Sequence, residues 1–326
     1  MENQDVRKIL NPTQHIVIHF LSALGVSSTM PKSRQQIIDA VKRKLSPKTL
    51  SHVLTFVEAK HPKLWGEKRP WGFQKTCIYL ALYKELYGKS IRKLRKKVKV
   101  WWSYPRKTLG HNQQVIQRLL DKWGKKQVQC GSIDDWKRAV QHWDMPLTLK
   151  GTNLWIDSLD LQIKGKSRVK KKSRKWSYKL DAPGRRYMFI FDGNGRVRKW
   201  WGGYSPKIYD SHIPELKKWW IKRRLQKAVV VADQHFSWAR THLKGKVKFH
   251  TPIRKPKKRK RKRITKQLTK KEKQYNQNVH EVRARVENWF AQLQTKVESL
   301  GKIWFEKEDA LDCVVSFAVG VINSEK

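Results

Sequence analysis

The chain has 326 residues, which is enough for two domains, one of them with a sizeable core. Its 74 Lys and Arg against 26 Asp and Glu give a formal net charge of +48, which predicts a polyanionic partner, with nucleic acid as the first candidate. An anionic membrane surface is the alternative, but the chain shows no apolar stretch as long as a membrane-spanning helix and no signal peptide.

The cysteines argue against two kinds of structural site. Cys77, Cys130 and Cys313 are far apart, odd in number and without a CxxC pair. We therefore expect neither a structural zinc site nor a disulfide framework. This usage predicts an intracellular, reducing environment.

Residues 1–69 are predicted to be helical, with mixed polarity. Ser33 and Ser46 are candidate N-caps, and Pro47 suits the first position of a helix. We expect a supporting region here. A small bundle for binding DNA ends or for self-association is the alternative.

Residues 70–150 contain three short helix candidates, at 73–88, 90–98 and 111–126. Their succession and their basic polar side favour a helix-turn-helix module that binds DNA. A helical linker with a solvated basic face is the alternative.

The segment 154–163 is predicted to be a strand that contains Asp157 and Asp160. Because these residues are three apart, they point to opposite faces of a regular strand, and at most one of them joins a shared site. The basic segment 164–179 follows directly. It is either a solvated loop or, as its position favours, a contact with DNA phosphates.

A hairpin with its turn at 192–195 is predicted next, which makes Asp192 a turn residue rather than a metal ligand. Asp210 and Ser211 precede a helix candidate at 212–225 and are expected to cap it. The Trp pairs at 200–201 and 219–220 are expected in the core or at an interface.

The apolar run Ala228 to Ala232 is typical of a central strand in a parallel sheet, and Asp233 ends it. Functional groups gather at the carboxyl ends of such strands. Further on, nine of the ten residues at 254–263 are cationic. We expect a loop that is disordered or ordered by DNA, and the run also resembles a nuclear import signal.

The segment 275–300 has the apolar spacing of an amphipathic helix packed against a core. Glu287 lies at the border of its apolar stripe, and Arg283 lies one turn earlier on the same side. Such a carboxylate can project into a pocket. The alternative is an exposed Glu that pairs with Arg283.

Asp157, Asp233 and Glu287 thus come from two strands and a late helix. If the three carboxylates meet, they repel one another unless a hard divalent cation neutralises them, and oxygen ligands suit Mg²⁺ or Mn²⁺. Such a cluster suits two-metal phosphoryl transfer on a nucleic acid.

Five segments resemble the DDE transposases, most closely the PIF/Harbinger type and its bacterial insertion-sequence relatives. They are WIDS around Asp157, GGYSPKIYDS at 202–211, VVVADQHF around Asp233, HTPIRK from His250 and YNQNVHEVRARVENWFAQLQ around Glu287. The last segment shows the family's order of an Asn, an Arg and Val-Glu, with a Phe three residues after the acid. The resemblance covers the second half of the chain. The departures, at 234–236 and in the dense basic run after Arg254, leave all three acids in place and affect loop geometry and DNA contacts.

The resemblance implies an α+β protein in which residues 151–326 form a ribonuclease-H-like domain with a mixed five-stranded sheet and a basic insert at 254–273. It implies that Asp157, Asp233 and Glu287 hold two Mg²⁺ or Mn²⁺ ions about 4 Å apart. The reaction would be cleavage of transposon ends, followed by attack of the freed 3′-OH on target DNA. Arg283 would orient Glu287 or contact a phosphate.

The resemblance also implies that the helix-turn-helix region binds terminal inverted repeats. The residues expected nearest the DNA there are Arg106, Lys107, His111, Asn112 and Gln113. Further DNA contacts are expected from two basic runs, namely Lys170, Lys171, Lys172, Arg174 and Lys175, and Lys257, Lys258, Arg259, Lys260 and Arg261. The expected assembly is a homodimer or larger on DNA, with a Myb-like helper protein as a further partner. Localisation would be nuclear in a eukaryote and in the cytoplasm or nucleoid otherwise.

Two alternatives to a transposase stay open. One is a domesticated DNA-binding protein that keeps the fold but no longer cleaves. The other is a ribonuclease-H-like nuclease that cleaves branched DNA without strand transfer.

Overall fold

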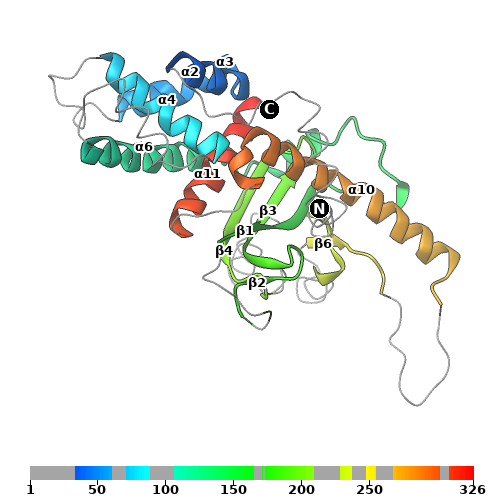
Figure 1. The fold of residues 1–326 in the computed structure, drawn as a ribbon. Helices are drawn as coiled ribbons and strands as arrows, with labels where there is room; N and C mark the ends of the chain where they lie inside the picture. Colours follow the sequence, from blue (N-terminus) through cyan, green and yellow to red (C-terminus); the bar gives the residue numbers. More distant parts are fainter. Residues whose placement is uncertain are drawn as a thin grey trace, which may run out of the picture.

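The structure is a computed structural model that describes residues 34–60, 71–88, 106–164, 171, 173–208, 228–236, 247–254, 267–301 and 308–326. Helices form one end of the molecule, and a mixed sheet crossed by a long helix forms the other (Figure 1). Within these residues, no helix has the length and apolarity required to cross a membrane.

The sheet has three antiparallel strands followed by two strands that run parallel to the first. β1 pairs with β3 on one side and with β5 on the other, and β6 continues the sheet beyond β5. β4 and the short β2 both pair with β3. The strands are β1 (Leu154–Gln162), β2 (Trp176–Ser177), β3 (Ala182–Asp192), β4 (Val197–Tyr204), β5 (Ala228–Ala232) and β6 (Val247–His250). This is the predicted α+β, ribonuclease-H-like arrangement, with the two-residue β2 as an addition to the five expected strands.

Both faces of the sheet are covered, which explains why β5 is apolar throughout and why most residues of β1, polar ones included, are buried. Trp155 and Val231 belong to a core on one face, while Leu154, Ile156 and Ala232 belong to a second core on the other. On the second face, Trp136 of the short helix α7 (Ile133–Arg138) is fully buried. The first face is the one that α10 covers.

Helix α10 (Lys270–Lys296) confirms the predicted amphipathic helix. It starts at a capping box, in which the Thr269 side chain accepts from the Glu272 backbone and the Glu272 side chain accepts from the Thr269 backbone. The predicted apolar stripe is buried along its whole length. It comprises Val279, Val282, Val286, Phe290 and Leu293, and it continues past the end of α10 through Val297 to Leu300 in the 3-10 turn η6 (Glu298–Gly301).

The N-terminal helices share a core with the sheet instead of forming a separate unit. One continuous cluster of buried residues runs from Ile37 through the helices to Trp155 and Phe189 of the sheet. The connection is α11 (Glu308–Glu325), which lies beside α6 (Figure 1). The other N-terminal helices are α2 (Arg34–Lys44), α3 (Pro47–Ala59), α4 (Trp71–Tyr87) and α6 (Arg106–Lys126).

Two glycines allow α6 and α11 to approach each other. A Cβ atom at Gly124 of α6 would lie 2.1 Å from the carbonyl oxygen of Ser316, and one at Gly320 of α11 would lie 2.6 Å from the Cα of Gly124. Only residues without a side chain fit at this crossing. The C-terminal half of the chain is therefore packed directly onto the N-terminal half.

Several predicted local features are also present. Ser46 caps α3, with Pro47 at its first position, and the hairpin of β3 and β4 turns at the predicted residues. Of the three helix candidates at 70–150, α4 and α6 are present, while the candidate at 90–98 lies outside the described residues, as do Ser33, Asp210, Ser211 and the helix candidate at 212–225.

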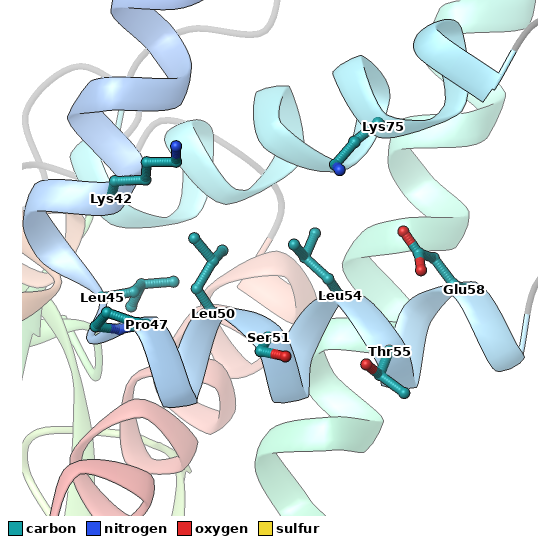
Figure 2. A pocket seen from close by; sticks show the side chains of 9 residues that line it. All are labelled: Lys42, Leu45, Pro47, Leu50, Ser51, Leu54, Thr55, Glu58 and Lys75. Atoms are coloured by element: carbon teal, nitrogen blue, oxygen red, sulfur yellow. The ribbon is translucent and has the colours of Figure 1, made fainter.

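A cavity of about 540 Å³ opens among the N-terminal helices (Figure 2). Leu45, Leu50 and Leu54 line it, with Lys42 and Lys75 on its sides. All of its lining residues come from α2, α3, α4 and the turn between α2 and α3. It therefore contains none of the candidate catalytic acids.

Candidate active site

The register of the two central strands places Asp157 beside Asp233. Ile156 of β1 pairs in parallel with Ala232 of β5. The residue that follows each of them in the sequence is an aspartate. Two residues before the aspartates, Trp155 and Val231 form the same kind of pair and belong to the core under α10. Because side chains alternate along a strand, both aspartates point to the α10 face.

Arg283 of α10 joins the two aspartates through a single nitrogen atom. Its Nη2 lies 2.7 Å from Oδ2 of Asp157 and 3.7 Å from Oδ2 of Asp233. The helix is held on β1 at this point, because the indole nitrogen of Trp155 donates to the carbonyl oxygen of Val282 at 3.0 Å. The contact between β1 and α10 thus fixes the position of the Arg283 guanidinium beside the two aspartates.

The other oxygen of each aspartate is oriented by the backbone. Oδ1 of Asp157 accepts from the Ser158 N–H at 2.7 Å, and Oδ1 of Asp233 accepts from the His235 N–H at 3.2 Å in the 3-10 turn η5 (Gln234–Phe236). Both Oδ2 atoms therefore face the same cationic nitrogen. Asp157 is buried, while the Asp233 side chain is 26% exposed, so solvent reaches the site from the β5 side.

The charges around Arg283 extend to Glu287. The pKa of Arg283 is raised above its ordinary value. Burial alone would lower that pKa, but three carboxylates outweigh burial, those of Asp157, Asp233 and Glu287. The guanidinium thus interacts electrostatically with all three predicted acids.

Glu287 lies apart from the aspartate pair. It is exposed, one helical turn after Arg283, and it forms no hydrogen bond or ion pair within the described ranges. In those ranges, no three His, Cys, Asp or Glu side chains are close enough to hold one metal ion. The alternative given above, a pairing of Arg283 with Glu287, is replaced by a hydrogen bond from Arg283 to Asp157, because β1 lies directly under this turn of α10.

The aspartate pair fits a hard divalent cation. Both side chains offer only carboxylate oxygens as ligands. The Oδ1 atom of each aspartate is held by a backbone N–H, and the two Oδ2 atoms converge on the guanidinium of Arg283. Oxygen ligands of this kind suit Mg²⁺ and Mn²⁺. Glu287 is the further acid whose charge acts on Arg283, and it would need to move inward to complete the set.

Two other aspartates have structural roles, which the sequence predicted for Asp192. Asp160 faces the opposite side of β1 from Asp157, where it pairs with Arg186 at 2.7 Å and accepts from Ser177 at 2.6 Å. Asp192 is fully buried in the hairpin turn, where it accepts from two backbone N–H groups and pairs with Arg198 at 2.7 Å. Neither belongs to the site.

The residues predicted to bind DNA from α6 divide into two groups. Asn112 and Gln113 lie inside the protein, with 2% and 5% of their surface exposed, so they do not face solvent in this conformation. Arg106, Lys107 and His111 lie in the first turns of α6, and their side chains are outside the description.

Three of the predicted cations after β1 are exposed, namely Lys171, Arg174 and Lys175. This segment is attached to the turn after β4, because Lys207 Nζ donates to the Lys171 carbonyl at 2.9 Å and Ser205 donates to the Arg174 carbonyl. The remaining predicted cations, Lys170, Lys172, Lys257, Lys258, Arg259, Lys260 and Arg261, lie outside the described residues.

Two residues of the basic segment 164–179 were not singled out from the sequence as DNA contacts. Tyr178 is 72% exposed, with the ammonium of Lys207 at 5.7 Å from its ring centroid. Lys179 Nζ lies 3.1 Å from Oγ of Ser158, the residue after Asp157. The alternation of aromatic and basic residues at 174–179 was the signal that could have identified both.

Sequence reasoning also did not identify the role of Asn276, which precedes Glu287 on α10. The Asn276 side chain forms two hydrogen bonds with the backbone of Ile253, accepting from its N–H at 2.7 Å and donating to its carbonyl oxygen at 3.0 Å. The two ends of the basic insert at 254–273 are thereby held together. This Asn belongs to the segment that resembled DDE transposases, but its partner could not be read from the sequence.

Comparison with known families agrees with this geometry. A model described as DDE superfamily endonuclease matches residues 156–323, more than half of the chain, from the residue before Asp157 into α11. The match includes Asp233, Arg283 and Glu287. No curated protein and no solved structure was found to match the chain. Endonucleases of this superfamily use divalent metal ions and act on DNA. The chain belongs to the DDE superfamily of endonucleases.

Proposed function

We propose that the protein is a DNA transposase that cleaves transposon ends and joins the freed 3′-OH to target DNA. The observation that carries this proposal is the pairing of Ile156 with Ala232, which sets Asp157 and Asp233 side by side under α10. The exposed Glu287 on the same helix supplies the third acid of the DDE pattern.

In this proposal, Asp157, Asp233 and Glu287 hold two Mg²⁺ or Mn²⁺ ions. When bound, such ions activate the attacking oxygen and stabilise the leaving oxygen of an in-line phosphoryl transfer. The chain contributes rigid placement of the ligands, since Asp157 lies in the buried central strand and Asp233 ends the neighbouring one. Glu287, on the surface of α10, is the ligand that has to adjust.

The exposed cations near β2 support DNA as the substrate. We define the basic patch as Lys171, Arg174, Lys175, Tyr178, Lys179 and Lys207. These residues lie on two segments that are hydrogen-bonded to each other, and Lys179 contacts Ser158, whose side chain lies on the face of β1 opposite Asp157. We propose that the patch contacts phosphates of DNA that continues past the site onto this face, with the Tyr178 ring against a sugar or base.

The remaining parts of the proposal concern the N-terminal half. The cationic start of α6, with Arg106, Lys107 and His111, is proposed to contact the terminal repeats as part of a helix-turn-helix module. A homodimer or larger assembly on DNA, a Myb-like helper protein and nuclear localisation in a eukaryote are proposed on the family resemblance alone.

The test is a cleavage and joining assay with labelled duplexes taken from the genomic DNA on either side of the reading frame, incubated with Mg²⁺ or Mn²⁺. A transposase gives cut ends and joined products. Cut ends without joined products would indicate a nuclease, and binding without either would indicate a domesticated protein. Products that form equally well with Asp157→Asn would show that the aspartate pair is not the active site.

A further inference from the structure

Arg283 occupies the position where a cation between the two aspartates would be expected. Its Nη2 atom is within 2.7 Å of one carboxylate and 3.7 Å of the other, and both contacts are made through the Oδ2 atoms that no backbone group orients. A positive charge at this position offsets the repulsion between two neighbouring carboxylates. The same atoms are those that a metal ion would need.

We propose that Arg283 is an internal counter-ion that closes the metal site of the DNA-free protein and that a divalent cation binds by displacing its guanidinium from Asp157 and Asp233. This proposal rests on the proposed function, because it assumes that the aspartates are metal ligands. It adds that Arg283 competes with the metal ion for the two aspartates, a role that the acids alone do not suggest.

Two features of Arg283 suit a side chain that is exchanged. Its hydrogen bond is made by Nη2 alone, while its Nε is buried without a hydrogen-bond partner. A guanidinium can donate five hydrogen bonds, so this one is only partly satisfied where it lies. The side chain is 21% exposed, which leaves a path outward to solvent along α10.

The exchange would link metal binding to DNA binding. A guanidinium released from the aspartates stays beside the site and is available to a phosphate, so DNA that attracts Arg283 should strengthen metal binding. By linkage, metal should strengthen DNA binding by the same factor. Without DNA, the competition with Arg283 keeps the metal affinity low.

The experiment measures Mn²⁺ binding to the full chain without DNA, by electron paramagnetic resonance of the free ion. Arg283→Met removes the charge and keeps most of the side-chain volume. We expect it to bind Mn²⁺ about tenfold more tightly than the wild type, a coupling typical of two charged groups in contact. Arg283→Lys, whose single shorter ammonium reaches the aspartates less well, should fall between the two.

Arg285→Met is the matched control. Arg285 lies on the same helix and loses the same charge, but its guanidinium stacks on Trp143 at 3.5 Å and does not contact the acids. It should bind Mn²⁺ like the wild type, so a tighter Arg283→Met cannot be attributed to net charge. Asp157→Asn should abolish binding in both the wild-type and the Arg283→Met background.

The outcomes separate the inference from the proposed function. If the wild type binds Mn²⁺ through Asp157 but Arg283→Met and Arg283→Lys bind no more tightly, the inference is wrong and the metal site stands. If no variant binds Mn²⁺ in a way that Asp157→Asn abolishes, both are wrong. Thermal melting with and without Mn²⁺ shows whether each variant is folded. If Arg283→Met is not folded, the Mn²⁺ affinity of Arg283→Lys decides the test.

Discussion

Ile156 and Ala232 form the last parallel pair between β1 and β5, and the residues that follow them are the two aspartates of the candidate site. The site therefore depends on strand register. A shift of β5 by one residue would turn Asp233 to the opposite face of the sheet. The burial of Ala232 in the core on that opposite face opposes such a shift.

The first prediction concerns the three acids. Asp157→Asn, Asp233→Asn and Glu287→Gln should each lower Mg²⁺-dependent cleavage by about a thousandfold or more, since each removes about 4 kcal/mol or more of transition-state stabilisation. DNA binding, measured by fluorescence anisotropy, should change little. Glu281→Gln is the control, because Glu281 is an exposed acid on the same helix that pairs only locally with Gln277. Full cleavage by Glu287→Gln would remove Glu287 from the site.

The strands and α10 could be predicted because the spacing of their apolar residues follows from which of their faces are buried. Ala228 to Ala232 is apolar without interruption because both faces of β5 are covered, and the stripe of α10 has helical spacing because one side faces the sheet. The acids Asp157 and Asp233 followed from their positions within or directly after such strands.

The partner of Arg283 could not be predicted in the same way. In the sequence its nearest acid on the helix face is Glu287, four residues later, so a local pair was the alternative to a Glu287 that projects into a pocket. In the structure, the place where α10 crosses β1 decides the contact instead, and that crossing is fixed by Trp155 and Val282. Asn112 and Gln113 illustrate the same limit, because polar side chains that suggested DNA contacts are buried by tertiary packing.

The basic patch leads to a prediction about salt. Lys175→Ala and Lys179→Ala should each weaken DNA binding at low salt and reduce the slope of log affinity against log salt by about 0.9 for each phosphate that the variant no longer neutralises. Lys137→Ala on α7 is the control, since Lys137 is exposed, lies beside Asp134 and is not one of the patch residues. Titrations of a labelled duplex at several salt concentrations measure the slope. An unchanged slope in both patch variants would mean that DNA does not pass over this surface.

The close crossing of α6 and α11 leads to a prediction about stability. Gly124→Ala would place a methyl group 2.1 Å from the Ser316 carbonyl oxygen, so the helices must separate, and we expect a loss of about 1–3 kcal/mol in the free energy of unfolding. Gly301→Ala is the control, because its added methyl group meets no atom within 4 Å, and the change should stay within about 0.5 kcal/mol. Denaturant titrations of both variants provide the measurement. Equal stability of the two would show that this crossing has room for a side chain.

Tyr87 leads to a prediction about alkaline pH. Burial, the charge of Glu298 and the neighbouring Tyr83 raise its pKa to about 12, against a smaller opposing effect of Arg43. The phenol donates a hydrogen bond to the carbonyl oxygen of Ala40 at 2.9 Å, which links α4 to α2.

Because the pKa of Tyr87 is higher in the folded than in the unfolded protein, the neutral phenol contributes stability that is fully present below pH 10. That contribution is lost as the pH rises from the ordinary value of 10 towards about 12, since only the unfolded chain ionises in this range. Tyr87→Phe should cost about 1 kcal/mol at neutral pH through the loss of this hydrogen bond, and it should flatten the decline of stability between pH 10 and 12. Tyr178→Phe, at an exposed position, should leave the decline as it is in the wild type. Urea midpoints measured from pH 7 to 12 test this, and an equally steep decline in Tyr87→Phe would mean that other groups cause the alkaline loss of stability.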